Sequence, residues 1–135
     1  MKAVVCKAWG LPETLVVEEL PEVTPKAGEV MIDIFAAGVN FPDVLIIQNK
    51  YQFKPELPFT PGNELAGVVR AVGEGVTHLK VGDRVLAAVQ GGFAEVALAD
   101  AQNVYRLPEG LGFAEASALR INYLTALHGL RDRAN

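Results

Sequence analysis

Residues 65–89 read Leu65-Ala66-Gly67-Val68-Val69-Arg70-Ala71-Val72 and, after an interval, Val81-Gly82-Asp83-Arg84-Val85-Leu86-Ala87-Ala88-Val89. Two apolar runs of strand length are therefore separated by a segment that ends in a glycine turn. Glycine favours such turns because it tolerates backbone angles that other residues avoid. This stretch predicts two β-strands, Leu65–Val72 and Val85–Val89, in a fold built mainly from β-structure.

The same pattern extends in both directions from this stretch. In Val30–Ala37, the apolar side chains of Val30, Ile32 and Ile34 fall on one face, as in a half-buried strand. Further strand candidates are Ala3–Cys6, Leu15–Leu20, Phe93–Leu98 and Val104–Leu107, with Pro21–Gly28 and Gln48–Asn63 as surface loops. Many short strands at this spacing predict a mainly β, mostly antiparallel, partly open barrel.

Helical signals are few and are concentrated at the end of the chain. Phe41–Ile47 predicts a short helix, because Pro42 and Asp43 suit a first helical turn. Phe113–Leu119 is rich in alanine and glutamate, and Asn122–Arg131 has leucines at helical spacing. The late change from strands to helices predicts a β domain over residues 1–120 and, over 121–135, the start of a helix leading toward a second domain.

Composition excludes several classes of partner. The chain has 135 residues, a net charge of −4 and interspersed acids and bases, so it lacks the basic surface that binds nucleic acid or anionic lipid. No uncharged run exceeds ten residues, against the roughly 18 needed to cross a bilayer, so we expect no membrane partner. The single cysteine, Cys6, forms no internal disulfide, and a reducing, cytoplasmic location is expected.

Four motifs occur in a fixed order along the chain. They are Ala36-Ala37-Gly38-Val39-Asn40-Phe41-Pro42-Asp43, Pro61-Gly62-Asn63-Glu64-Leu65-Ala66-Gly67-Val68-Val69, Val72-Gly73-Glu74-Gly75-Val76 with Val81-Gly82-Asp83-Arg84-Val85, and Gly91-Gly92-Phe93-Ala94-Glu95. With Asn122-Tyr123-Leu124-Thr125-Ala126, they make the chain resemble the medium-chain dehydrogenase/reductase superfamily. Within it, the chain resembles the zinc-free quinone oxidoreductase (zeta-crystallin-like) branch.

This resemblance implies a GroES-like barrel that supplies one wall of an active-site cleft. In the family a Rossmann domain follows the barrel and binds NADPH, so the cofactor would be held mainly outside these residues. Gly73-Glu74-Gly75 does not replace that domain, because it lacks the third glycine and does not open a helix. The preference for NADPH follows from the resemblance alone.

Zinc is not expected. Zinc-dependent members of the superfamily bind their catalytic metal through a cysteine and a histidine at the positions of Asn40 and Asn63. Asparagine amides are poor zinc ligands beside thiolate and imidazole. One cysteine also cannot build a four-cysteine structural site.

Four residues are candidates for the site, each with an alternative structural role. Asn40 is predicted to be a catalytic residue that contacts cofactor or substrate, and Asp43 to contact substrate, although both could simply cap a helix and brace a loop. Tyr51 is predicted to bind substrate and to donate a proton, or else to pack its loop. The resemblance places Thr125 against the nicotinamide, whereas its hydroxyl could instead bond the preceding helical turn. Glu64 is read as structural, and Arg120 has no evident role.

The expected function is hydride transfer from NADPH to quinones or other activated alkenes. Hydroquinone oxygens can take protons from water, so little acid catalysis is needed. The alternative enzyme is a 2-enoyl-thioester (enoyl-CoA or acyl-carrier-protein) reductase with Tyr51 as proton donor, because residues 49–58 also resemble that branch. A third hypothesis, of another class, is a free-standing binding or assembly module without enzymatic activity.

The 135-residue chain alone is expected to be inactive, because it offers only one wall of the cleft. Apolar residues of the terminal helix, such as Leu124 and Leu127, are expected to be exposed. The chain is therefore expected to form homo-oligomers through that helix or to have a frayed tail.

Overall fold

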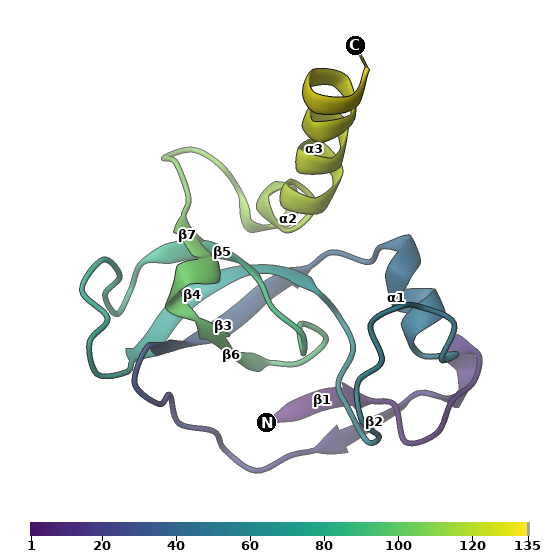
Figure 1. The fold of residues 1–135 in the computed structure, drawn as a ribbon. Helices are drawn as coiled ribbons and strands as arrows, with labels where there is room; N and C mark the ends of the chain where they lie inside the picture. The colour runs from purple at the N-terminus through teal and green to yellow at the C-terminus, as the bar shows by residue number, and fades with distance from the viewer. Residues whose placement is uncertain (135) are drawn as a thin grey trace.

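The computed structural model describes residues 1–134, and antiparallel strands make up most of its regular structure (Figure 1). The larger sheet has five strands in the order β6-β3-β4-β5-β7. Their bounds are β3 Glu29–Ala37, β4 Glu64–Val72, β5 Arg84–Ala88, β6 Val96–Asp100 and β7 Val104–Arg106. A smaller sheet pairs β1 (Lys2–Val5) with β2 (Val16–Glu19), also antiparallel.

The centre of the larger sheet is the long pair β3 and β4. Its register shifts between Met31 and Ile32 and again between Ile34 and Ala36. Such irregularities bend a strand and increase its twist, which is how a sheet curls toward a barrel. Gly67 of β4 lies so close to the Asp33 carbonyl that a Cβ would collide with it. The glycine therefore permits the tight approach of the two strands.

The smaller sheet is linked through single bridges to segments that precede strands of the larger one. Ala3 of β1 pairs with Ala94, just before β6, and Cys6, just after β1, pairs with Phe59 in the loop before β4. The result is a curled half-barrel, which confirms the predicted mainly β, partly open architecture.

The predicted strand Phe93–Leu98 is wrong at its start, because β6 begins only at Val96. Residues 93–95 follow another course: the Phe93 N–H donates to the Pro61 carbonyl at 3.0 Å, and the Glu95 N–H donates to the Lys2 carbonyl at 3.0 Å. The preceding glycines turn the chain toward these partners, and the ladder with β3 starts where Val96 meets Asp33.

Three apolar clusters make up the core. The largest takes side chains from all five strands of the larger sheet, including Val30, Leu65, Val85, Ala97 and Val104. A second cluster packs Cys6, Ile46, Ile47 and Phe59 beneath the first helix. A third joins Ala66 and Leu86 of the sheet to Ala116 of a later helix.

The helices lie where the sequence predicts them, with shifted ends. Helix α1 spans Phe41–Ile46, and helix α2 spans Phe113–Ser117. The terminal helix α3 spans Arg120–Leu127 and continues as a π-helical segment η3, His128–Arg133, rather than as the single helix predicted over Asn122–Arg131. Three-residue 3₁₀ turns, η1 (Pro12–Thr14) and η2 (Ala101–Asn103), complete the elements.

Helix α3 projects away from the sheet, and α2 lies between it and the strands (Figure 1). No residue of α3 is buried. The predicted linking segment 121–135 ends at Asn135, which lies outside the described residues. Across residues 1–134, no helix has both the length and the apolar character needed to span a membrane.

Candidate functional site

The candidate site is built where β3 ends and α1 begins. Asn40 occupies the position just before α1 with an extended backbone (φ −122°, ψ 161°), and Asp43 is in the first turn. The Asn40 backbone N–H donates to Oδ2 of Asp43 at 2.7 Å. A carboxylate at this place is favoured because it pairs an N–H at the helix start and complements the helix dipole. Asp43 therefore caps α1.

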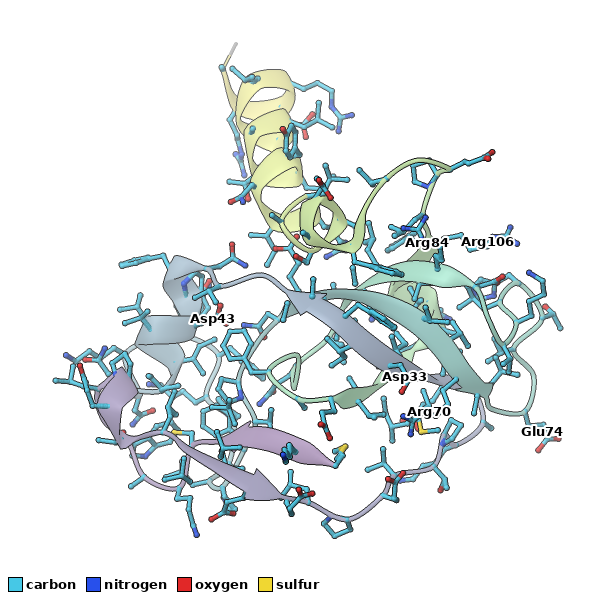
Figure 2. All side chains as sticks on the ribbon, turned by 180° about the vertical axis from the view of Figure 1, so that it is seen from behind. Asp33, Asp43, Arg70, Glu74, Arg84 and Arg106 are labelled. Atoms are coloured by element: carbon cyan, nitrogen blue, oxygen red, sulfur yellow. The ribbon has the colours of Figure 1, made fainter. Side chains whose placement is uncertain are left out.

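Asp43 is also buried, with 4% of its surface exposed. Its second oxygen, Oδ1, accepts a hydrogen bond from Nδ2 of Asn63 at 2.9 Å. Burial raises the pKa of the Asp43 carboxyl, because desolvation penalises the charged form; the bonds from Asn40 and Asn63 oppose this rise and the nearby Glu64 adds to it. Figure 2 shows Asp43 on α1, away from the labelled arginines.

Glu64, at the start of β4, is a second buried carboxylate, with none of its surface exposed. Its Oε2 accepts a hydrogen bond from the side-chain Nδ2 of Asn40 at 3.1 Å. Its Oε1 accepts one from the backbone N–H of Ile121, in the first turn of α3, at 3.0 Å. We call this pair of contacts the Glu64 bridge, because it links the start of α1 to the start of α3.

Asn40 and Asn63, which stand where the resemblance implies zinc ligands in zinc-dependent members, are thus both bound to carboxylates. Asn40 donates its side-chain amide to Glu64, and Asn63 donates its amide to Asp43. Within residues 1–134, no group of three or more His, Cys, Asp or Glu side chains is placed to hold a metal ion. The donor set consists of amides engaged in hydrogen bonds, which is unlike a zinc site.

Tyr51 lies in a different environment. Its ring packs, partly buried, against the apolar cluster of Cys6, Ile46, Ile47 and Phe59. The sequence analysis gave Tyr51 two alternatives, packing its loop or donating a proton, and this contact corresponds to the first.

Thr125 is exposed on α3, one helical turn beyond Ile121. Among the described residues, no hydrogen bond joins Thr125 or Tyr51 to Asn40 or Asp43. The structure therefore brings Asn40 and Asp43 together and connects them to the helix that carries Thr125, while Tyr51 belongs to a separate cluster. The roles of all four residues at a site stay predictions.

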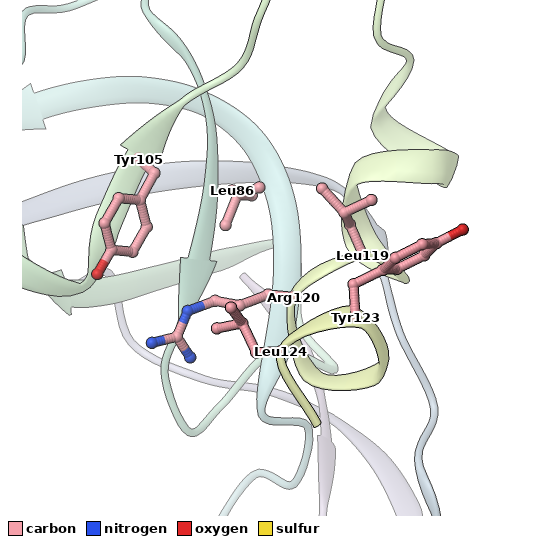
Figure 3. A pocket seen from close by; sticks show the side chains of 6 residues that line it. All are labelled: Leu86, Tyr105, Leu119, Arg120, Tyr123 and Leu124. Carbon is pink, nitrogen blue, oxygen red and sulfur yellow. The ribbon is translucent and has the colours of Figure 1, made fainter. Parts of the chain in front are cut away.

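A pocket of about 380 Å³ lies at the foot of α3 and contains none of the four predicted residues. Figure 3 shows the side chains that line it, namely Leu86, Tyr105, Leu119, Arg120, Tyr123 and Leu124. The guanidinium carbon of Arg120 lies over the ring of Tyr105, 5.7 Å from its centroid. This cation–π contact gives Arg120 a structural role that the sequence did not reveal.

A nicotinamide cofactor has hydroxyl and amide groups at its reactive end and phosphates farther away. The partly exposed amide of Asn40 and the exposed hydroxyl of Thr125 fit the first kind of group, since each can accept and donate hydrogen bonds. The phosphates usually bind at a glycine-rich turn that opens a helix. Gly110-Leu111-Gly112 opens α2, but Glu115 stands where the dinucleotide-binding pattern has its third glycine, and neither α1 nor α3 follows a Gly-x-Gly turn. The described residues therefore fit the nicotinamide end and not the phosphates.

Sequence reasoning missed the connecting role of Glu64 and the partner of Arg120. A signal for Glu64 was present, because a charged residue opens the otherwise apolar run 64–69 and buried charges need partners. The identity of those partners could not be read from the sequence, since Ile121 lies 57 residues away.

Comparison with known proteins shows that the chain is similar to one part of several longer oxidoreductases. Residues 26–109 match the family model described as the alcohol dehydrogenase GroES-like domain. The quinone oxidoreductase of Homo sapiens is 41% identical over 133 residues, which cover 96% of this chain and 40% of that protein. The polyketide synthase component PikAII of Streptomyces venezuelae is 46% identical over 128 residues, covering 95% of this chain and 3% of that protein.

Solved structures agree with this relationship. The quinone oxidoreductase of Escherichia coli, complexed with NADPH, superposes with a TM-score of 0.92 at 34% identity, covering 97% of this chain and 40% of that one. The chain thus spans about two fifths of the length of the quinone oxidoreductases it matches.

Proposed function

The chain belongs to the alcohol dehydrogenase GroES-like domain family, and we propose that it forms the substrate-side domain of a zinc-independent, NADPH-dependent reductase of quinones or other activated alkenes. The observation that carries this proposal is the hydrogen bonding of Asn40 and Asn63. Both amides are held by buried carboxylates where zinc-dependent members of the superfamily are expected to have metal ligands. The identity to quinone oxidoreductases over nearly the whole chain supports the choice of substrate.

NADPH supplies the hydride when bound, and the chain's residues orient the reactants. Asn40 is held from two sides, through its backbone N–H by Asp43 and through its amide by Glu64, so its position is fixed before a ligand arrives. Such preorganisation lowers the entropic cost of bringing two reactants together. Thr125 contributes a hydroxyl on the nicotinamide side. A quinone needs no acid from the protein, because water can protonate its reduced oxygens.

We assign residues 1–120 to the domain and 121–135 to the segment that leads toward a nucleotide-binding domain. Two features support this division. The apolar clusters and all strands lie within the first part, and the second consists largely of exposed helix. The similarity to a longer protein complexed with NADPH supports the cofactor.

The second candidate is reduction of a 2-enoyl thioester, with Tyr51 donating a proton. It is favoured by the 46% identity to a polyketide synthase component. The packing of Tyr51 into an apolar cluster does not favour it, because a proton donor must reach the substrate.

The test uses the full-length protein that carries these residues. NADPH oxidation is followed with a simple quinone and with an enoyl thioester, before and after dialysis against a chelator, and the metal content is measured. We expect faster turnover of the quinone, no loss on chelation and well under one zinc per chain. Stoichiometric zinc whose removal abolishes activity would contradict zinc independence. Turnover of the thioester alone would favour the second candidate, and no turnover of either would favour a binding module.

A further inference from the structure

Glu64 links two segments of the chain that are distant in sequence. It is fully buried, yet its two oxygens reach two segments that are distant in sequence, at Asn40 and at Ile121. Burying a charge is costly unless its oxygens are hydrogen-bonded. The Glu64 bridge therefore satisfies the buried carboxylate and connects the candidate site to α3 through one residue.

The bridge also decides which end of the Asn40 amide faces a ligand. A carboxylate can only accept hydrogen bonds, so the Nδ2 end of the amide must point toward Glu64. The carbonyl oxygen Oδ1 is then turned away from Glu64. This oxygen lies in the capping box at the start of α1, where it faces the Asp43 N–H. A carbonyl oxygen has two lone pairs, and because Asn40 is only partly buried, the second one is left for a ligand.

At its other end, the bridge holds the start of α3. N–H groups in the first turn of a helix have no partner within the helix, and a negative charge near them is favourable. The Ile121 N–H is such a group, and Glu64 accepts its hydrogen bond. Nearby, a Cβ added at Gly38 would collide with the Ser117 carbonyl and lie 3.1 Å from Oε2 of Glu64. The absence of a side chain at Gly38 thus leaves room for both the bridge and the α2–α3 junction.

We propose that Glu64 is a positioning residue that orients the Asn40 amide with its oxygen toward the ligand and, through the same carboxylate, sets the position of the helix that carries Thr125. The ligand group that the Asn40 carbonyl oxygen would bind is then a hydrogen-bond donor. A quinone has only acceptors, so the donor would be a hydroxyl or carboxamide N–H at the nicotinamide end of NADPH. This last assignment rests on the proposed function, whereas the bridge itself does not.

The first test is Glu64→Gln in this chain, followed by NMR of the Asn40 side-chain amide and by hydrogen exchange of the Ile121 amide. A glutamine oxygen can keep the bond from Ile121, but its NH₂ then faces Asn40, whose amide must rotate to offer its oxygen. We expect the Asn40 amide protons to move toward solvent-exposed shifts and the Ile121 N–H to exchange up to about tenfold faster, since a neutral acceptor is weaker. Glu95→Gln, at an exposed carboxylate that accepts the Lys2 N–H, is the matched control and should change neither signal.

The second test is a charge exchange. Asn40→Asp alone places two carboxylates against each other and should destabilise the chain. In Asn40→Asp with Glu64→Gln, the glutamine NH₂ can donate to the carboxylate introduced at position 40, whose second oxygen then faces the ligand. We expect the double variant to have an unfolding equilibrium constant at least about tenfold smaller than that of Asn40→Asp. This comparison stays decisive even if Glu64→Gln alone does not fold.

The contact between Asn40 and the cofactor is then tested by measuring NADPH binding to the full-length protein. We expect Glu64→Gln to weaken NADPH binding by about tenfold, because a donor replaces the acceptor at Asn40, and the double variant to recover it. Unchanged Asn40 signals in folded Glu64→Gln, or a double variant no more stable than Asn40→Asp, would overturn the bridge whatever the cofactor does. Changed signals with unaltered NADPH binding would support the bridge and overturn only the contact between Asn40 and the cofactor.

Discussion

At the scale of single residues, the candidate site balances its two buried carboxylates against amides and N–H groups rather than against cations, unlike Asp83, which pairs with Lys80. Asp43 is paired with Asn40 and Asn63, and Glu64 with Asn40 and Ile121. An arrangement of this kind keeps each oxygen hydrogen-bonded without an ion pair. The partners are neutral, so desolvation of Asp43 is only partly compensated and its pKa is raised.

The raised pKa of Asp43 predicts a pH dependence of stability. Between the ordinary value of 3.8 and the raised value, the folded state binds a proton that the unfolded state has released, so stability falls as pH rises through this window. Asp43→Asn has no such titration. We expect the unfolding free energy of the wild-type chain, relative to Asp43→Asn, to decrease from acidic to neutral pH in denaturant titrations. Asp100→Asn controls for the loss of one charge, and a difference that grows with pH would contradict the prediction.

Tyr51 separates the two candidate enzymes. In the full-length protein, Tyr51→Phe removes one hydroxyl and keeps the ring that packs against Ile46 and Phe59. For a quinone we expect kcat/KM to change less than about threefold, whereas loss of a proton donor for an enoyl thioester costs about 10²-fold or more.

The matched control for this substitution is Tyr105→Phe, which removes a hydroxyl from an exposed tyrosine at the pocket at the foot of α3. A large loss with the quinone would show that Tyr51 takes part in quinone reduction, against our proposal.

At the scale of elements, the junction between α2 and α3 depends on its close contact with the end of β3. Gly38 donates its N–H to the Glu64 carbonyl at 2.9 Å and faces the Ser117 carbonyl without room for a methyl group. Because that obstacle is backbone, it cannot rotate away as a side chain would. The placement of α3 therefore depends on a glycine 82 positions before its first residue.

We expect Gly38→Ala to destabilise the chain by about 1–3 kcal/mol, the usual cost of forcing extra volume into a packed interior. Gly129→Ala is the control, since Gly129 lies in the exposed segment η3 with nothing within 4 Å of an added Cβ. There the better helix propensity of alanine should leave stability unchanged or raise it by up to about 1 kcal/mol. The stabilities of the two variants are compared through their denaturant midpoints. Equal effects of the two substitutions would contradict the close contact at Gly38.

At the scale of the whole molecule, α3 extends from the half-barrel with a largely uncovered surface (Figure 1). Leu124, Leu127 and Leu130 are 50%, 47% and 75% exposed. Apolar surface of this kind favours association. In the proposed function, the half-barrel supplies only the nicotinamide side of the cleft.

For the 135-residue chain alone, we expect no measurable NADPH oxidation with a simple quinone and self-association that increases with concentration. Orientation of two reactants is worth about 7–11 kcal/mol, and one wall of a cleft cannot provide it. Nicotinamide fluorescence measures NADPH binding and oxidation, and sedimentation measures self-association. We expect Leu130→Glu to reduce self-association and Glu109→Gln, the surface control, to leave it unchanged. Saturable micromolar binding with steady turnover would contradict the proposed active site.

Local patterns along the chain were enough to predict the mainly β architecture, the loops and the approximate position of every helix. Such features depend on the spacing of apolar, glycine and proline residues, so they are readable without a structure. The same patterns placed Asn40 and Asp43 at the start of a helix, whereas the family resemblance made them candidates for the site. The errors lay at ends that depend on distant partners, such as the start of β6, where Phe93 binds Pro61 instead of pairing with β3.

What those candidates contact follows from the folded chain alone. Asn40 meets Glu64, Glu64 meets Ile121, and Arg120 meets Tyr105 across intervals of 15 to 57 residues. Hydrogen bonds and cation–π contacts act over a few ångströms and need a defined geometry. The curvature of the sheet and the packing of α2 against it bring these partners within contact distance. Neither the curvature nor the packing is encoded by a local pattern in the sequence.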